Sequence, residues 1–585
     1  MDPIIAILLG VIAIVAASVL APKVRVAGPL ILVVLGIGVS LLPFVPEIEV
    51  DPEFILVGVL PPLLYAAAVR LPAIEFRRDF RPIAGLSVVL VLLSSVVLGL
   101  FFYALIPGID FLLAIALGAI LSPTDAVATS IVKRLGISRR IVTILEGESL
   151  LNDATSLVVL RVMIASSAVV AADSDGRQPN LFVAFAWGVL VAVVLGWLVG
   201  YLNLRLRAHV HQPAANSALG FIVPFVAYLP TEQLGGSGLV AAVVAGIVTG
   251  QGAARRFTPE QRLSDEANWR TIELLLEGGV FLVMGLELKE IVDENYAAHG
   301  GLGRAAVLAA TALGIILVVR IGWVSFLVWL QSRRAREQRR RRLDEIGARL
   351  DEIETGPSTR RRTGPDAVGR AVVARVGRIA RMREVVARRL ADLDYYQASP
   401  LGWRQGAVLV WAGLRGVVTL AAAQTLPRET PERALLVLVA FLVAVGSLVI
   451  QGLTLPWLVR RLGLRSAGGD TISADEQTQI DDELRSAAVT ALADPALRRR
   501  DGRPFPDELV HATSGRLTDP PDDDTSVAAR DRLELRLRVI EAMRDRLLEL
   551  SSGGSYSTPA LRHMLAELDA DQLSVELRLE DEDRD

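Results

Sequence analysis

The sequence predicts an all-α polytopic membrane protein with about 13 transmembrane helices and a helical cytoplasmic tail at its C-terminal end. Of its 585 residues, 52% are hydrophobic, and the first 330 consist mainly of apolar runs of membrane-spanning length. Short polar stretches separate these runs, and no single water-soluble core would bury all of them. Lys and Arg are concentrated in every second loop, as expected of a chain that crosses a bilayer repeatedly.

Thirteen apolar windows are predicted to cross the membrane. The first is interpreted as a span and not as a cleaved leader, because Asp2 stands where a signal peptide carries positive charge. Spans one to six and eight to thirteen are expected to form inverted repeats with two broken crossing helices. The windows are 3–21, 27–46, 54–71, 82–107, 110–133, 141–172, 181–205, 214–230, 234–252, 269–290, 302–330, 403–425 and 433–462.

The charges of the loops predict the orientation of the chain. The loops after spans one, three, five, seven and nine carry the cations, whereas 47–51, 173–175 and 293–294 on the other side are acidic. Because cytoplasmic loops are the basic ones, an odd number of spans puts the N-terminus outside and the C-terminal tail in the cytoplasm. The cations are Lys23, Arg25, Arg77, Arg78, Arg81, Lys133, Arg134, Arg139, Arg140, Arg205, Arg207, Arg255, Arg256 and Arg262.

Two domains are predicted. Residues 1–465 form the transmembrane domain, and residues 466–585 form a cytoplasmic tail with a helical module at about 526–580. The transmembrane domain includes a basic cytoplasmic loop, 331–402, which either simply follows the positive-inside bias or contacts anionic lipid. Apolar residues at helical spacing from Leu533 to Leu548 predict an amphipathic helix that packs on itself, on the membrane domain or on a second copy.

The composition argues against several classes of protein. The chain has no Cys, which excludes disulfides, thiolate metal sites and cysteine nucleophiles. None of the 5 His lies in a predicted span, which argues against an intramembrane hydrolase with a histidine base. The glycine-rich phosphate loop of nucleotide-driven pumps is also missing from the sequence. We therefore expect no enzyme activity, no cofactor and no nucleic-acid partner, and expect membrane lipid around the spans.

Ionisable side chains inside predicted spans mark the candidate functional site. Each costs roughly 2.5–3.5 kcal/mol on insertion and needs a partner or a water-lined cavity. These charges lie in spans five, six, ten, eleven and twelve. They are Asp125, Glu148, Asp153, Arg161, Glu277, Arg320 and Arg415, with Glu146 nearer the end of a span.

Two of these spans are predicted to be broken helices. Pro123 inside span five removes a backbone donor and clashes with the preceding turn, and in span twelve two glycines bracket Arg415 and loosen the helix. Free carbonyls and helix ends suit ion coordination, and the matched positions of the two breaks predict that they meet. The alternative in span five is a simple kink, with Thr124 and Asp125 only capping the second half-helix.

One face of span six offers a hydroxyl, an amide and a carboxylate. Ser149 precedes Asn152 and Asp153 by three and four residues, and Glu148 lies one turn from Asn152. Such hard oxygen ligands suit a small alkali cation, and they lack the imidazole and thiolate groups that transition metals prefer. A purely structural polar seam between helices is the alternative interpretation.

Taken together, these motifs resemble the sodium/proton antiporters of the monovalent cation:proton antiporter-1 family, in its prokaryotic branch. The motifs are Thr124-Asp125, the run from Glu148-Ser149 to Asn152-Asp153, and Gly413-Leu414-Arg415-Gly416. The resemblance covers about residues 1–465. It implies a thirteen-helix fold with a core of six helices, a homodimer in the bacterial inner membrane, and electroneutral exchange because an Asn precedes the essential Asp.

The resemblance also implies roles for individual residues. Asp153 would carry the ion or the proton, and Thr124, Asp125, Ser149 and Asn152 would shape its site. The transported Na+ would bind at Asp153, Thr124 and Ser149. Stabilising ion-pair partners would be Glu148, Arg320 and Arg415.

Two positions depart from the family pattern. Ala66 lies in span three where several relatives carry a Glu at or next to this position, so one acidic group of the family is missing. Glu277 is an extra acid where a neutral residue is expected, and we expect it to pair with Arg320 or Arg161.

The predicted function is secondary active antiport that serves pH homeostasis. A proton and a monovalent cation, Na+ before the others, would compete for Asp153, and alternating access would couple their movements. One alternative is a K+/H+ or Li+/H+ antiporter. Another is a cation channel or uniporter that uses the same oxygens without coupling, and a further one is a membrane sensor whose tail is the active part.

Overall fold

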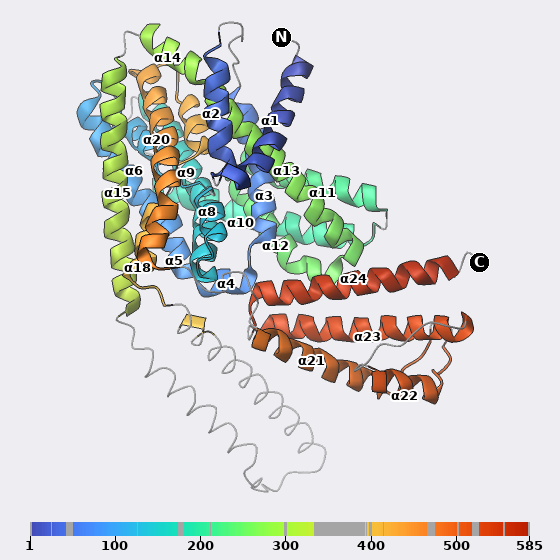
Figure 1. Ribbon diagram of the computed structural model, residues 1–585. Helices are drawn as coiled ribbons and strands as arrows, with labels where there is room; N and C mark the ends of the chain where they lie inside the picture. Colours follow the sequence, from blue (N-terminus) through green and yellow to red (C-terminus); the bar gives the residue numbers. More distant parts are fainter. Residues whose placement is uncertain are drawn as a thin grey trace, which may run out of the picture. The chain divides into compact units, whose positions relative to one another are not determined.

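The computed structural model describes most of the chain, and within those residues the fold is all helical, without a β-strand. They form two compact units, one from residues 1–331 and 401–470 and the other from residues 332–400 and 471–585. Figure 1 shows the helices of both units. The described residues are 3–24, 26–42, 51–125, 127–172, 181–210, 212–297, 301–332, 392, 395–396, 400–413, 415–464, 474–499, 502–516, 526–553 and 556–582.

The first unit contains long helices and several short ones that interrupt them. They are α1 (Pro3–Val24), α2 (Gly28–Ser40), the π-helical turn η1 (Phe54–Val59), α3 (Leu60–Arg70), α4 (Ala73–Arg78), α5 (Phe80–Ala84), the π-helical turn η2 (Gly85–Val89), α6 (Leu90–Leu105), α7 (Phe111–Ile120), α8 (Val127–Arg134), α9 (Arg139–Ala172), α10 (Leu181–Arg207), α11 (Pro213–Gln233), α12 (Gly238–Arg256), α13 (Pro259–Leu286), α14 (Leu288–Ala297), α15 (Leu302–Ser332), α18 (Trp403–Trp411), α19 (Val417–Gln424) and α20 (Arg433–Leu462).

Helices occupy each of the thirteen windows that were predicted to cross the membrane. Within the described residues, 8 helical stretches are long and apolar enough to cross a bilayer, and shorter apolar helices fill 28–40, 54–70 and 111–120. The exact number of crossings stays a prediction. The basic loop predicted at 331–402 lies almost wholly outside the described residues. The eight stretches are Ile4–Val24, Phe80–Leu105, Arg139–Val169, Leu181–Arg207, Pro213–Gln233, Gly238–Arg256, Leu302–Leu330 and Arg433–Leu462.

Both predicted breaks are confirmed. α7 ends at Ile120 and α8 begins at Val127, so Pro123 lies in a non-helical stretch between them. Span twelve is divided in the same way, because α18 ends at Trp411 and α19 begins at Val417. Each break leaves backbone N–H and C=O groups without intrahelical partners inside the bundle.

The helices of the first unit pack into two groups. The core group consists of α5 to α9, α18 to α20 and α15, with α15 packing against η2 through Trp323 and Leu327. The support group consists of α1 to α3 and α10 to α13. Figure 1 shows α6, α15 and α20 on one side of the bundle and α10 to α12 on the other. The core group contains spans four to six and eleven to thirteen.

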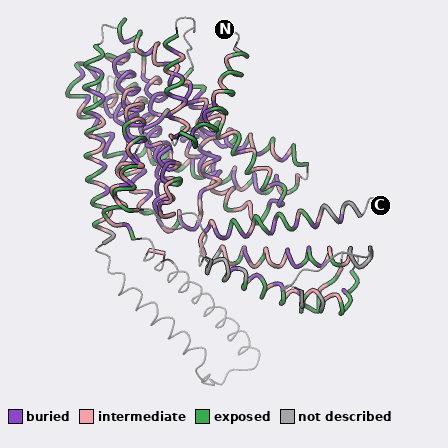
Figure 2. The backbone as a smooth tube through the Cα atoms, viewed as in Figure 1, coloured by how far each residue is buried: buried purple, intermediate pink, exposed green. Residues whose placement is uncertain are grey.

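Large apolar side chains cover the outward faces of several long helices. Ile4 of α1, Phe182 of α10 and Val318 of α15 are 73%, 78% and 69% exposed. Exposed positions follow the outer sides of these helices in Figure 2. Apolar surface of this extent is unfavourable in water and is covered by the hydrocarbon of a bilayer.

Close helix packing in the first unit depends on glycines. A Cβ at Gly118 of α7 would overlap the Ser95 carbonyl of α6, and one at Gly99 of α6 would lie 2.8 Å from the Ile115 Cα of α7. Gly36 and Gly285 form a similar contact between α2 and α13. Small residues at such contacts let helix backbones approach closely enough for dispersion forces to hold them together in lipid.

The second unit contains α21 (Ala474–Leu492), α22 (Asp507–Arg516), α23 (Ser526–Gly553) and α24 (Thr558–Glu582). The amphipathic stripe predicted in the tail lies on α23, which packs against α21 and α24. Its Leu535 and Val539 join Leu492 and Phe505 in a small apolar cluster. Arg546 of α23 adds an ion pair with Glu483 of α21.

We expect Gly118→Val to lower the stability of the first unit by about 3 kcal/mol, because the new side chain would push α7 away from α6. Thermal unfolding of the detergent-solubilised protein would measure the loss. Gly314→Val is the matched control, since Gly314 lies on an exposed part of α15 with no atom near its Cβ position. Equal unfolding temperatures for the two variants would contradict the expected close contact.

Candidate functional site

The two broken helices meet at their breaks. Arg415, between α18 and α19, donates from Nε to the Leu121 carbonyl at 3.2 Å, and Leu121 is the C-cap of α7. Its backbone N–H donates to Ser447 Oγ of α20 at 2.9 Å, and its guanidinium also reaches the Gly413 carbonyl. A cation beside the C-terminal end of a helix is stabilised by the free carbonyls there. Arg415 therefore joins the breaks, but it forms no ion pair within the described residues, unlike the role implied by the resemblance.

Asp125 lies at the N-terminal ends of two half-helices. Its Oδ1 accepts a hydrogen bond of 3.1 Å from the backbone N–H of Val127, the first residue of α8. Its carboxylate also packs directly against Gly416, the N-cap of α19. The positive ends of both helix dipoles stabilise a negative charge at this point.

Gly413 and Gly416 are required by close packing. A Cβ at Gly416 would overlap the carboxylate of Asp125, and a Cβ at Gly413 would lie 2.7 Å from Nε of Arg320. The sequence alone favours the interpretation that these glycines loosen the helix around Arg415. The structure gives a different reason, because they allow a carboxylate and a guanidinium to approach the backbone of the break.

A chain of hydrogen bonds runs from α9 through the first break to α15 and α18. Asn152 Nδ2 donates to Thr124 Oγ1 at 2.8 Å, and this hydroxyl donates to Glu148 Oε1 at 3.4 Å. Glu148 forms a bidentate ion pair with Arg320, with 2.8 Å between Oε2 and Nη2. Arg320 Nε donates to the Leu409 carbonyl at 3.0 Å. Glu148 and Arg320 are thus the ion pair that the resemblance implied.

The acceptors next to this chain have no partners. Asp153 is 9% exposed, and its carboxylate accepts no hydrogen bond and forms no ion pair with the described residues. The Asn152 Oδ1 atom is buried without a donor, and the Ser149 hydroxyl has no partner in that part of the chain either. Unpaired oxygens on adjacent turns of a helix are able to bind a proton or a hard cation.

The described residues contain no group of three His, Cys, Asp or Glu side chains placed to hold a metal ion jointly. A site around Asp153 would therefore combine one carboxylate with neutral oxygens. Such a ligand set suits a monovalent alkali cation better than a divalent or transition metal, whose sites use several carboxylates or imidazoles.

Arg161, further along α9 than Asp153, forms an ion pair with the support group. It contacts Glu232 of α11 and donates to the Tyr228 hydroxyl at 3.1 Å. Glu232 also accepts a hydrogen bond of 2.7 Å from the backbone N–H of Gly238, at the start of α12. This pair connects the core group with the support group.

Glu277 pairs with neither Arg320 nor Arg161, so that expectation is wrong. Both arginines are used by other carboxylates, and Glu277 has no hydrogen bond or ion pair within the described residues. Ala66 is completely buried in an apolar cluster of the support group.

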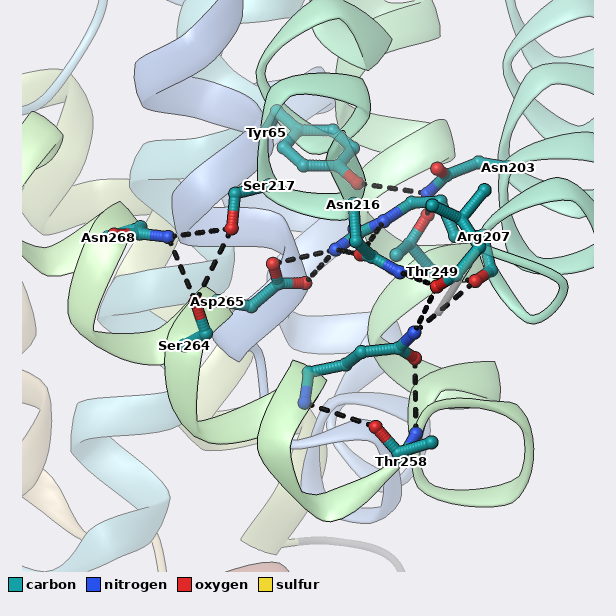
Figure 3. Close-up of polar contacts among 12 residues, drawn as sticks. Tyr65, Asn203, Arg207, Asn216, Ser217, Thr249, Thr258, Ser264, Asp265 and Asn268 are labelled. Carbon is teal, nitrogen blue, oxygen red and sulfur yellow. Dashed lines mark hydrogen bonds and ion pairs between the residues drawn. The ribbon is translucent and has the colours of Figure 1, made fainter. Parts of the chain in front are cut away.

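A second buried polar network holds the support group together (Figure 3). Arg207 of α10 lies 2.7 Å from Asp265 of α13 and donates to Asn216 of α11 at 2.7 Å. Asn203 donates to Thr249 of α12 at 3.0 Å. Because the charges in this network are matched, its role is structural. Sequence reasoning treated Arg207 only as a loop cation, and no sequence signal indicated its partners.

Asp79 and Arg140 form another pair that sequence reasoning missed. The carboxylate, just before α5, accepts from Nε and Nη2 of Arg140 on α9 at 3.0 and 2.8 Å. Both side chains are almost completely buried. The sequence signal that could have indicated this pair is Asp79 itself, because it is the single acid within the basic loop at 77–81.

We expect Glu148→Gln to destabilise the protein by about 3–5 kcal/mol, because Arg320 would remain buried without a counter-charge. Thermal unfolding in detergent would measure this. In the control, Glu266→Gln, the substituted side chain forms an exposed pair with Arg270 and should change stability by less than about 1 kcal/mol. Unfolding of Glu148→Gln at the wild-type temperature would disprove the structural role of the pair.

Comparison with known proteins adds an independent assignment. The sequence model of the family described as "Sodium/hydrogen exchanger, transmembrane" matches residues 10–343 and 371–461. An uncharacterized Na+/H+ exchanger of Mycobacterium tuberculosis is 29% identical over 584 residues, which cover 97% of this chain and 95% of that protein. The Na+/H+ antiporter ApNhaP of Aphanothece halophytica is 24% identical over 437 residues, 74% of this chain and 69% of that protein.

Among solved structures, the sodium proton antiporter MjNhaP1 from Methanocaldococcus jannaschii aligns with a TM-score of 0.53 and 15% sequence identity. The alignment covers 80% of this chain and 100% of that chain, and at this identity it shows the fold alone. Because the family's sequence model matches more than half of the residues, the chain belongs to the family of transmembrane sodium/hydrogen exchangers and is a secondary cation/proton transporter, not an enzyme.

Proposed function

We propose that the protein exchanges Na+ for H+ by alternating access at Asp153. The observation that carries this proposal is the open carboxylate on α9, which is 9% exposed and has no partner within the described residues. An acid buried in this way costs free energy while it is charged, so it favours a bound proton or a bound cation. These two cargoes compete for the same oxygens.

Neutral oxygens close to Asp153 support a small alkali cation as the second cargo. Asn152 Oδ1 and the Ser149 hydroxyl are unpaired, and the Thr124 hydroxyl keeps a lone pair beyond the two hydrogen bonds it makes. Hard oxygens of this kind favour Na+. The names of the relatives, which are Na+/H+ exchangers and antiporters, agree with sodium, and K+ is the second candidate because it uses the same ligands.

Coupling follows from the charge of the carboxylate. Asp153 is neutral when it is protonated and balanced when it holds Na+, whereas the empty carboxylate carries a full negative charge. Moving that charge past apolar surface is costly, so only the loaded forms cross between the inward-facing and outward-facing states. One proton then exchanges for one cation, without net charge transfer and without ATP.

The packing of the first unit supports a division into two parts. The core group would be a carrier that moves with the ion, and the support group would be a frame that stays in place. The hydrogen bonds from Asn152 through Glu148 and Arg320 tie α9, α15 and α18 together, so the core group would move as one body. The Arg207 network fixes α10, α11 and α13 to one another, so the support group would stay in place. Asp153 lies in the part that moves.

We assign this carrier and frame to residues 1–465, in the bacterial cell membrane, with the N-terminus outside and the tail 466–585 in the cytoplasm. The exposed apolar faces of α1, α10 and α15 support contact with lipid, and the distribution of basic loops supports the orientation. A homodimer is the assembly that the family resemblance favours.

We expect Asp153→Asn to abolish exchange, because a neutral amide cannot alternate between binding a proton and balancing a cation. Purified protein would be reconstituted into vesicles with an acidic interior, and dissipation of the pH gradient would be followed after addition of NaCl, KCl or LiCl. Asp293→Asn is the control, since it removes an exposed carboxylate from α14.

Each outcome of this experiment has a distinct meaning. Cation-dependent proton movement in the wild type and in Asp293→Asn, with none in Asp153→Asn, supports the proposal. Full exchange by Asp153→Asn would remove Asp153 from its role. Cation flux that follows the membrane potential and ignores the pH gradient would replace the antiporter with a channel or uniporter.

Gly416→Ala tests the geometry of the break. The added Cβ would displace the carboxylate of Asp125, so we expect the exchange rate to fall by about tenfold or more while the helices remain folded. Gly446→Ala on α20 is the control, because no atom lies near its Cβ position. Wild-type rates in both variants, measured in the same vesicle assay, would show that Asp125 does not need its present position.

A further inference from the structure

Glu287 lies where the support group touches the core group. It is the C-cap of α13, and its side chain accepts a hydrogen bond of 3.1 Å from Nε2 of Gln424, the last residue of α19. Only 3% of Glu287 is exposed, and Gln424 is the one partner of its side chain within the described residues. A buried carboxylate with a single neutral donor is costly while it is charged. The contact therefore favours a form of Glu287 that carries a proton.

The amide of Gln424 is an independent sign of that proton. Its Oε1 atom is buried and accepts no hydrogen bond from the described residues. An amide oxygen needs a donor, and a charged carboxylate offers none. A protonated Glu287 has one O–H group, which would donate to this oxygen while its other oxygen keeps the bond from Nε2. One proton would thus satisfy both buried groups with a closed pair of hydrogen bonds.

The charged groups around Glu287 do not take the place of this proton. α19 and α2, both of which pack against α13, contain no ionisable side chain. Arg433 of α20 is held by other acceptors, since it donates to the Gln424 carbonyl at 2.7 Å and pairs with Glu294 of α14 at 3.5 Å. A proton remains as the balance for the carboxylate. The other charged side chains of α14, none of which pairs with it, are Lys289, Glu290 and Asp293.

The half-helix α19 connects this contact with the candidate ion site. It runs from its N-cap Gly416, which packs against the carboxylate of Asp125, to Gln424 at its other end. Its 8 residues span about 12 Å. Arg433 fixes the far end to α20 through the Gln424 carbonyl. Whatever holds Gln424 in place therefore also holds the helix break beside Asp125.

We infer that Glu287 and Gln424 form a second proton site, a latch that holds the carrier to the frame while the proton is bound. The proton closes the pair of hydrogen bonds between α13 and α19. When it leaves to water, the charged carboxylate keeps one neutral donor, the contact weakens, and the core group is released. The latch is thus complete at low pH and is lost as the pH rises. This inference rests on the proposed function, since it assigns a regulatory role within the same carrier and frame.

The test compares two substitutions of Glu287 that should move the pH profile of exchange in opposite directions. Glu287→Gln is neutral, donates and accepts like the protonated acid, and should keep the latch closed at every pH. Glu287→Ala removes both hydrogen bonds and should leave it open. Full-length protein is reconstituted into vesicles, and Na+-dependent proton movement is measured from acidic to alkaline pH. The control is Glu266→Gln, which makes the same chemical change in an exposed pair on the same helix.

The expected rates follow from the net contribution of one hydrogen bond. Glu287→Gln should exchange about fivefold more slowly than the wild type at alkaline pH and match it at acidic pH. Glu287→Ala should exchange about fivefold faster than the wild type at acidic pH and match it at alkaline pH. Glu266→Gln should follow the wild-type profile. A merely structural role of Glu287 would lower the rates of both variants and would not move their profiles apart.

The remaining outcomes are also decisive. Two Glu287 variants that keep the wild-type profile, or that shift it in the same direction, overturn the latch. A Glu287→Gln protein that fails to fold does so too, because a neutral donor at this position should strengthen the contact. If Glu287→Ala does not fold, Gln424→Leu decides in its place, since it removes the same hydrogen bonds from the other side. Faster exchange of Gln424→Leu at acidic pH supports the latch, and a wild-type profile overturns it.

Failure of the latch is distinguishable from failure of the proposed function. A wild type that exchanges, together with an inactive Asp153→Asn, keeps the function in place whatever the Glu287 variants do. A wild type without any exchange overturns the function and the latch together.

Discussion

The bidentate pair between Glu148 and Arg320 is the interaction on which the core group depends. It lies where α9, α15 and α18 come together, and both side chains are almost completely buried. A buried pair repays its desolvation only when its remaining donors and acceptors are also satisfied. Here Thr124 donates to the carboxylate, and the Leu409 carbonyl accepts from the guanidinium. The pair thus fixes the helices on both sides of the breaks.

The same pair explains why Asp153 differs from Glu148, although both acids lie on α9. Arg320 neutralises Glu148 permanently, and Gly413 provides the space that this arginine needs beside the second break. No cation is placed to do the same for Asp153 within the described residues. One acid of the helix is therefore held in a buried pair, and the other is the acid to which we assign the exchangeable proton and cation. Their different surroundings, and not their residue types, separate the two roles.

Sequence reasoning predicted the features that depend on short-range patterns. Apolar length indicated the helical windows, and Pro123 indicated the first break. Helical spacing placed Ser149 on the same face as Asn152 and Asp153. It failed where partners come from distant helices, because their identity depends on how each helix is rotated and where it crosses its neighbours. Glu277 was given an arginine partner that it does not have, and Ser447 gave no sign that it would contact a backbone N–H.

The placement of strong and weak contacts fits a carrier that moves as one body. Breaking the buried Glu148–Arg320 pair by removal of one partner costs about 3–5 kcal/mol, so the core group keeps its internal geometry. The Arg161–Glu232 pair connects the two helix groups, and its side chains are 39% and 25% exposed. Where water reaches such partly exposed side chains, the pair contributes only about 0–1 kcal/mol, because water and ions replace the lost contact. A contact of that strength can form and break in every transport cycle. In the mechanism that we propose, the contacts within the core group would hold through the cycle, and a change of charge at Asp153 would move the whole group.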